Sequence, residues 1–156
     1  MNKLSSRKAV AADLRQLMEI EKKCFPECDV FSRRNMRRMV NNPKCSILLD
    51  VLEYEQEVVG YAVYLTRRNS QTIRLYSLCL LPCYTGQGLT RKYLEERLKD
   101  FALRFSKVIL EVRQSNKAAI RLYHGLGFEL GQILEGYYAD GERGYRMVKN
   151  LKPKLP

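Results

Sequence analysis

The sequence contains no tryptophan and a single histidine, His124, among 156 residues. One histidine and five irregularly spaced cysteines do not form a zinc-binding pattern, so we expect no metal site. No apolar run is long enough to span a bilayer, and the first residues lack the apolar segment of a signal peptide. We therefore expect a cytoplasmic protein that does not bind membranes and whose cysteines are free thiols rather than a disulfide framework.

Acidic residues are few relative to basic ones: 17 Asp and Glu stand against 28 Lys and Arg, which gives a formal net charge of +11. Such a charge favours polyanionic partners, although it is equally compatible with plain solubility. Four arginines in "FSRRNMRRMV" fall on one side of a short helix. They form either a solvated face or a contact for a ribosome or an acidic protein: Arg33, Arg34, Arg37 and Arg38.

Helical and strand-like segments alternate along the chain, and no repeat or Pro/Gly/Ser-rich linker divides it. Apolar residues at helical spacing predict a helix over residues 12–25, beginning at an Asp13 cap. The remaining pattern predicts the arginine helix, strands over 45–53, 57–68 and 72–82, a helix over 87–105, a strand over 107–112, a helix over 116–127, and a hairpin over 128–151 turned at Asp140-Gly141. This order predicts an α/β domain with a mixed sheet.

A strand followed by Gly86-Gln87-Gly88 and then by a helix directs unpaired amides and the helix dipole toward an anion. Without side chains at the two glycines, a phosphate could approach the backbone closely. The same residues also fit a structural turn, and they match neither the P-loop nor the dinucleotide-binding fingerprint.

A second segment, "LEVRQSNKAAIRLYHGLGF", joined to "LCLLPCYTGQGL", resembles the GCN5-related N-acetyltransferase (GNAT) superfamily, and above all its bacterial ribosomal-protein N-terminal alanine acetyltransferases. The resemblance covers residues 4–151 and implies one domain over 1–156, with a mixed, mostly antiparallel sheet flanked by helices. It also implies acetyl-CoA as co-substrate. In the glycine loop only the central glycine matches the family pattern strictly. Thr85 stands where the pattern has a basic or amide residue, and Thr90 stands where it has a small residue.

The resemblance further implies which residues hold the cofactor. The strand before the loop pairs with the pantetheine arm, the loop and helix start hold the pyrophosphate, and an asparagine on the later helix adds a contact. The matching positions are Leu78, Cys79, Leu80, Gly86, Gln87, Gly88, Leu89, Thr90, Arg91, Asn116, Ala119 and Tyr123.

Two residues are candidates for proton transfer. Glu111 lies in "KVILEV", typical of an interior strand, where a carboxylate is either paired with Arg113 or catalytic. Tyr123 lies seven residues after Asn116 on one helix face, where a tyrosine can equally be core packing. The resemblance implies that Glu111 is the general base, often through a water, and that Tyr123 protonates the departing thiolate.

The acceptor amine is the least determined feature. An α-amine with a pKa near 8 is about one-tenth neutral at pH 7, against about one in a few thousand for lysine. The resemblance implies a peptide site in which Phe25 and Pro26 line the first-residue pocket while Tyr137 and Tyr138 hold the backbone, although these tyrosines also fit a half-buried hairpin. Transfer to lysine, a polyamine or an aminoglycoside remains an alternative, as does a non-catalytic domain that binds nucleic acid or the ribosome.

Overall fold

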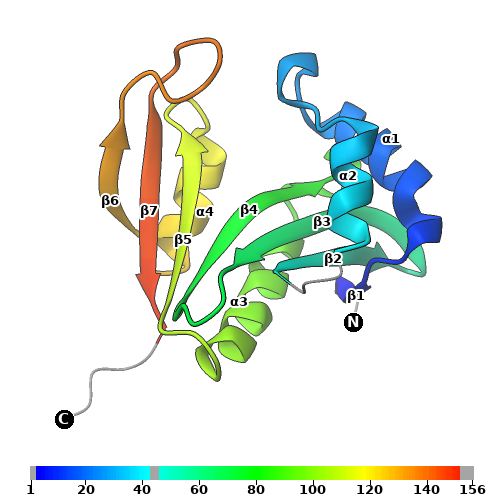
Figure 1. Ribbon diagram of the computed structural model, residues 1–156, viewed down its shortest axis with the longest axis horizontal. Coiled ribbons are helices and arrows are strands. Elements are labelled where there is room, and N and C mark those ends of the chain that lie inside the picture. Colours follow the sequence, from blue (N-terminus) through cyan, green and yellow to red (C-terminus); the bar gives the residue numbers. More distant parts are fainter. Residues whose placement is uncertain (1–2, 43–45, 152–156) are drawn as a thin grey trace. The chain divides into compact units, whose positions relative to one another are not determined.

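The computed structural model describes residues 3–42 and 46–151. Figure 1 shows the helices and strands along the chain. Three short 3-10 helices lie between them within the described residues. The elements are β1 (Ser5–Lys8), α1 (Leu14–Cys24), α2 (Arg33–Val40), β2 (Ile47–Tyr54), β3 (Glu57–Thr66), β4 (Thr72–Leu80), α3 (Leu89–Ala102), β5 (Lys107–Arg113), α4 (Lys117–Gly125), β6 (Glu129–Leu134) and β7 (Gly144–Asn150).

In the described part of the chain, seven strands form one sheet in the order β1-β2-β3-β4-β5-β7-β6. Strand β4 runs parallel to β5, whereas β1 with β2, β2 with β3, β5 with β7 and β6 with β7 are antiparallel. The predicted mixed, mostly antiparallel sheet is therefore confirmed. Within the described part of the chain, no helix combines the length and the apolar character needed to cross a membrane.

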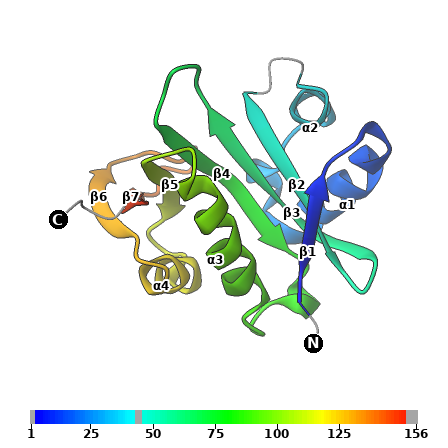
Figure 2. The same ribbon diagram turned by 90° about the horizontal axis from the view of Figure 1, so that it is seen from below.

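The chain forms two compact units, and β4 and α3 each contribute to both. The first comprises Met1–Thr66 and Tyr76–Tyr93, and the second comprises Arg67–Leu75 and Leu94–Pro156. In the first unit α1 and α2 pack on one face of β2 and β3, as Figure 2 shows. Their shared core includes Leu17, Met36, Val51, Tyr61 and Val63. That the whole chain is one domain stays a prediction.

The other face of β2 and β3 buries a polar cluster beneath the first turn of α3. The hydroxyl of Tyr93 donates to the carboxylate of Asp50 and lies 2.8 Å from the hydroxyl of Tyr64. Burial raises the pKa of Tyr93, so its phenol stays protonated and available to donate. Because buried polar groups are costly without partners, these contacts fix the start of α3 against the strands. The apolar side chains along this helix are buried, namely Leu89, Tyr93, Leu94, Leu98 and Phe101.

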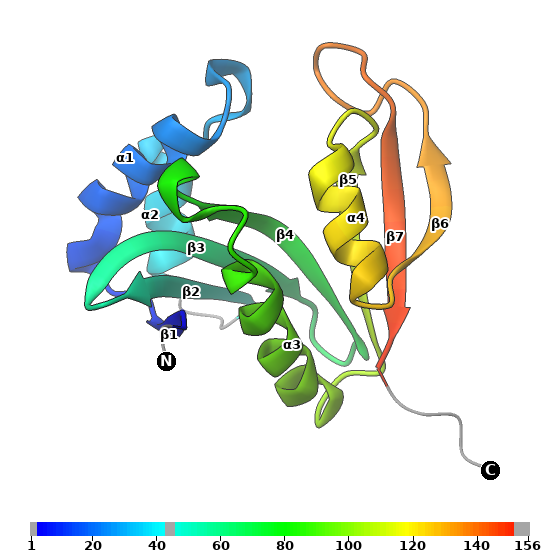
Figure 3. The same ribbon diagram turned by 180° about the vertical axis from the view of Figure 1, so that it is seen from behind.

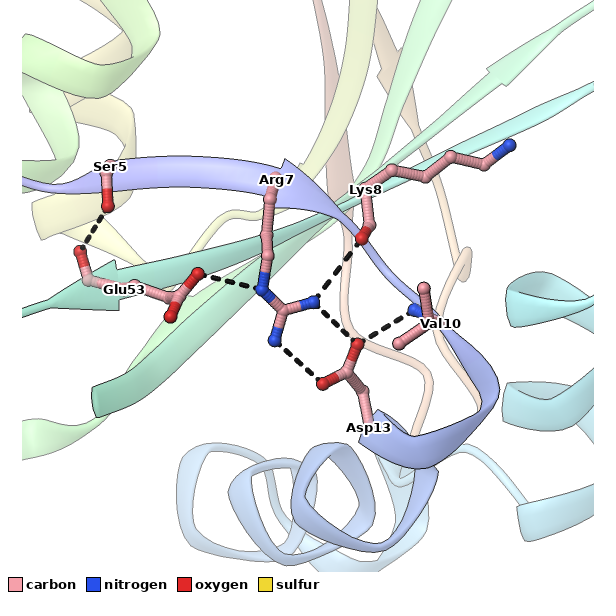
Figure 4. Close-up of polar contacts among 6 residues, drawn as sticks. All are labelled: Ser5, Arg7, Lys8, Val10, Asp13 and Glu53. Atoms are coloured by element: carbon pink, nitrogen blue, oxygen red, sulfur yellow. Dashed lines mark hydrogen bonds and ion pairs between the residues drawn. The ribbon is translucent and has the colours of Figure 1, made fainter. Parts of the chain in front are cut away.

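Strand β1 was not predicted, because all four of its side chains are exposed and it has no alternating apolar pattern. It is held by Arg7, whose guanidinium pairs with Asp13 at 2.8 Å and with Glu53 of β2 at 2.8 Å (Figure 4). Asp13 stands at the predicted N-cap of α1, but its side chain does not cap that helix. Its carboxylate instead accepts from the amide of Val10, and the hydrogen bond from Arg7 lowers its pKa.

In the second unit β5 lies between β4 and β7, as the interior-strand pattern predicted. Its burial alternates, however, so that Val108, Leu110 and Val112 are buried while Glu111 lies on the partly exposed face. Figure 3 shows α4 beside β5 and β7. Strands β6 and β7 form the predicted hairpin, and Gly141 in their connection has φ +86°.

Candidate active site

The glycine loop leaves β4 and leads into α3 with an exposed backbone. Gly86 and Gly88 have φ of +77° and +76°, and a Cβ added at either would meet no atom within 4 Å. These glycines are therefore required by the left-handed backbone conformation and not by crowding within the chain. Among the described residues, no group accepts from the amides of residues 86–90, as expected where a loop opens a helix.

Side chains of the loop fix its shape from within. The hydroxyl of Thr85 donates to the carbonyl of Pro82 at 2.8 Å, and the side-chain amide of Gln87 donates to the carbonyl of Cys83 at 3.1 Å. Thr85, which departs from the family pattern, thus has a local structural partner. The result is a preformed, open row of amides at a helix N-terminus, an arrangement that suits a phosphate group.

The end of β4 lies immediately before this loop. The described pairs of β4 with β5 run from Thr72 with Lys107 to Leu75 with Leu110, and β4 itself continues to Leu80. The thiol of Cys24 on α1 lies 3.4 Å from the carbonyl oxygen of Leu80 and donates to it. Leu78 is half-buried, while Cys79 and Leu80 are buried.

Gly60 of β3 allows this part of β4 to approach closely, and sequence reasoning missed it. A Cβ at Gly60 would overlap the carbonyl oxygen of Cys79 and would lie 3.1 Å from the Cα of Leu80. A glycine inside a strand pattern is itself a signal of close backbone approach, so "EVVGYAV" could have revealed this role.

In the second unit, the carboxylate of Glu111 is paired with two arginines. Its Oε1 lies 3.0 Å from Arg74 of β4 and 3.3 Å from Arg146 of β7, and the side chain is 8% exposed. The predicted alternative, an ion pair between Glu111 and Arg113, is wrong. Alternation along β5 does place Arg113 on the same face, but neighbouring strands supply the cations that Glu111 contacts. Neither Arg74 nor Arg146 was identified from the sequence, because cross-strand register is not visible there.

Tyr123 lies on α4, whereas Asn116 is the residue that caps the start of this helix. Tyr123 is buried with its ring 5.6 Å from that of Phe128, and burial is the main reason that its pKa is raised, with a smaller contribution from Tyr138. Asn116 is the N-cap of the helix, where its side-chain oxygen accepts from the amide of Ala119 at 3.2 Å. The asparagine thus has a structural role of its own.

The connection between β6 and β7 carries Tyr137 and Tyr138, whose rings meet edge to face at 5.0 Å. Tyr137 is 46% exposed. The guanidinium of Arg113 lies 4.1 Å from the centre of the Tyr138 ring and pairs with Asp140 and Glu142, each at 2.9 Å. Hydrogen bonds from Ser115 and Arg113 lower the pKa of Glu142 to about 2, which keeps this ionic anchor of the loop charged at neutral pH.

The predicted first-residue pocket, Phe25 and Pro26, lies in the first unit directly after α1. Phe25 is half-buried against the core and Pro26 is exposed. Glu21, which the sequence analysis did not single out, supports the loop that follows, because its Oε1 accepts from the amide of Phe31 at 3.0 Å. Burial raises the pKa of Glu21 to about 7, although the bond from Phe31 opposes this.

The candidate residues therefore form two groups. The first unit contains the end of β4, the glycine loop with Arg91, and Phe25 with Pro26; the second contains Glu111, Asn116, Ala119, Tyr123, Tyr137 and Tyr138. Cys24, Cys28, Cys79 and Cys83 are free thiols, and Cys45 lies outside the described residues. Over residues 3–42 and 46–151, no cluster of His, Cys, Asp and Glu could hold a metal ion.

Comparison with known proteins gives consistent matches. Residues 14–128 match the model of the acetyltransferase (GNAT) family. The catalytic subunit NAA10 of the N-terminal acetyltransferase A complex of Arabidopsis thaliana is 29% identical over 153 residues, which cover 95% of this chain and 78% of that protein.

Two solved structures share the fold. The ribosomal-protein-S18-alanine N-acetyltransferase of Escherichia coli has a TM-score of 0.82 at 27% identity, covering 99% of this chain and 97% of that one. A spermidine N-acetyltransferase of Vibrio cholerae, solved with CoA and spermine, has a TM-score of 0.81 with 96% of each chain covered. Its identity of 18% makes the likeness one of fold alone.

We predict that Gly60→Ala destabilises the protein by about 1–3 kcal/mol, because the new methyl group forces backbone rather than a flexible side chain to move. Urea unfolding measures the change. Gly131→Ala is the matched control, since its Cβ would meet the movable Cγ2 of Val148 at 3.0 Å. Equal stability losses in the two variants would contradict the close approach of β3 and β4 at Gly60.

Proposed function

The chain belongs to the acetyltransferase (GNAT) family, and we propose that it transfers the acetyl group of acetyl-CoA to the α-amine at the N-terminus of a polypeptide. Acetyltransferases of this family generally use acetyl-CoA. When bound, acetyl-CoA supplies an acetyl thioester, which is activated toward attack by an amine. The observation that carries the proposal is the row of open amides at residues 86–90, at the position where the family motif lies.

The residues of the loop fit the phosphates of this co-substrate. Residues 86–88 are exposed, the two glycines adopt the conformation that the turn needs, and the N-terminal end of α3 favours negative charge. Arg91 adds a cation in the first turn of the helix. The backbone of residues 78–80 would hold the pantetheine arm, and an amide near Leu80 would polarise the acetyl carbonyl. Asn116 and Ala119 would add contacts from α4.

Glu111 and Tyr123 are suited to opposite proton transfers. Glu111 would accept the proton that the amine loses, directly or through a water, while Arg74 and Arg146 hold its carboxylate in place. Tyr123 keeps its proton at neutral pH because burial raises its pKa, and among the described residues its hydroxyl makes no hydrogen bond. It would donate that proton to the departing sulfur.

A polypeptide α-amine is the acceptor that the observations support best. The Arabidopsis and Escherichia coli proteins are named as N-terminal and ribosomal-protein-alanine acetyltransferases. An α-amine is also neutral far more often than the amine of lysine at pH 7, so a single general base suffices to deprotonate it. Phe25 and Pro26 would surround the first side chain, and Tyr137 and Tyr138 would bind the peptide backbone. A ribosomal protein is one such acceptor.

We predict that Tyr123→Phe lowers kcat by about one to three orders of magnitude with little change in acetyl-CoA affinity, since the ring stays while the donor is lost. The Glu111→Gln variant should lose most activity, relative to the wild type, at low pH, because the acceptor amine is then mostly protonated and depends most on a base. Steady-state kinetics from pH 6 to 9 and titration calorimetry measure these effects. Wild-type rates in both variants would reduce the two residues to structural roles.

The proposed function is tested with peptides that differ in one amine at a time. A peptide with a free α-amine and no lysine should be acetylated, and the same peptide with a blocked α-amine and one lysine should not. Mass spectrometry locates the acetyl group. Faster transfer to the blocked peptide, or to spermidine, would replace the proposal with a lysine or polyamine acetyltransferase.

A further inference from the structure

The first unit contains a pocket of about 750 Å³ beside α2, which we call the α2 pocket. Arg37 and Arg38 of α2 line it together with the aromatic residues Phe31 and Tyr76. Leu65 of β3 adds an apolar wall. The pocket therefore combines two cations with aromatic and aliphatic surface, and none of these residues belongs to the site described above.

The two arginines of the α2 pocket have no carboxylate partner among the described residues. Both side chains are exposed, and neither guanidinium forms an ion pair or hydrogen bond among these residues. Elsewhere arginines are commonly neutralised: Arg7 pairs with Asp13, and Arg146 pairs with Glu111. Two guanidiniums that line one pocket without an internal partner are complementary to an external carboxylate, with which each can form charge-assisted hydrogen bonds.

The aromatic side of the α2 pocket is preorganised. The rings of Phe31 and Tyr76 are nearly parallel, at 9°, with centroids 5.7 Å apart. Phe31 is fixed further by its backbone amide, which donates to the buried carboxylate of Glu21. Tyr76 is nevertheless 49% exposed, an unusual state for a tyrosine in an interior strand. A side chain that binds here meets a surface that is already ordered.

The α2 pocket lies at a defined separation along β4 from the proposed acetyl-transfer site. Tyr76 precedes Leu80 by four residues, or about 13 Å at 3.3 Å per residue. An extended acceptor whose α-amine lies near Leu80 spans that distance in about four residues. Its third to fifth residues are then the ones that can reach Arg37 and Arg38.

We propose that the α2 pocket selects acceptors with an acidic side chain at the third to fifth position, through Arg37 and Arg38. The inference rests on the proposed transfer to a polypeptide N-terminus. It favours a peptide over a nucleic acid because only two of the four arginines of α2 line the pocket, which is too few for a tract of phosphates.

The test compares two peptides with a free N-terminus, one carrying glutamate at positions three to five and one carrying glutamine there. Wild-type kcat/KM should be roughly tenfold higher for the acidic peptide, and the preference should fall with added salt. In the double variant Arg37→Gln/Arg38→Gln this preference should disappear, while the rate on the glutamine peptide stays unchanged.

The matched control is Arg33→Gln/Arg34→Gln, which removes the same charge from the same helix outside the pocket and should keep most of the preference. Equal losses in the two double variants, or equal rates on the two peptides in wild type, would overturn the pocket assignment and leave the proposed function standing. If neither peptide is acetylated, the proposed function fails instead.

Fluorescence anisotropy of the labelled acidic peptide, measured without turnover, gives its binding affinity for the α2 pocket independently of catalysis. Binding lost only in the Arg37/Arg38 variant supports the inference. Tighter, Arg37/Arg38-dependent binding of a single-stranded oligonucleotide overturns it.

Discussion

A row of backbone amides at the start of α3 has no acceptor among the described residues, and much of the first unit holds this row in place. A helix whose first N–H groups face solvent is tolerated, but it is also a ready site for an anion. The buried cluster of Asp50, Tyr64 and Tyr93 fixes the first turn of α3 to β2 and β3. Gly60 lets the end of β4 approach β3 just before the loop. Both features position the backbone on either side of the glycine loop. Neither contributes a reactive side chain.

In the second unit the features that matter are the positions of three candidate side chains, Glu111, Tyr123 and Tyr138. Glu111 is oriented by arginines from two neighbouring strands, and Tyr138 is held by a cation beneath its ring. Tyr123 is buried, which raises the pKa of its phenol and keeps it protonated at neutral pH. Ion pairing thus holds the carboxylate of Glu111 in place, whereas burial keeps the phenol of Tyr123 protonated.

Much of this could be predicted from the sequence, because hydrophobic period and glycine placement are local signals. They gave the helices, six of the seven strands and the loop at Gly86 and Gly88. Strand β1 has no apolar side chain and is held by Arg7, a contact with no local signature. The partners of Glu111 depend on strand register, so Arg113 was the natural but wrong expectation. The resemblance to the family supplied candidate roles for the site residues. The stacking of Phe31 on Tyr76 could not be predicted, because it joins residues 45 positions apart in the sequence.

Hydrogen exchange of the amides of residues 86–90 tests the central claim, that these groups receive the phosphates of acetyl-CoA. Exchange is measured for the free protein, with saturating acetyl-CoA, and with acetyl-pantetheine, which has the thioester but no phosphate. Acetyl-CoA should slow exchange at these amides by about tenfold or more, and acetyl-pantetheine should not. Unchanged rates with bound acetyl-CoA, or equal protection by both compounds, would contradict the assignment of this loop.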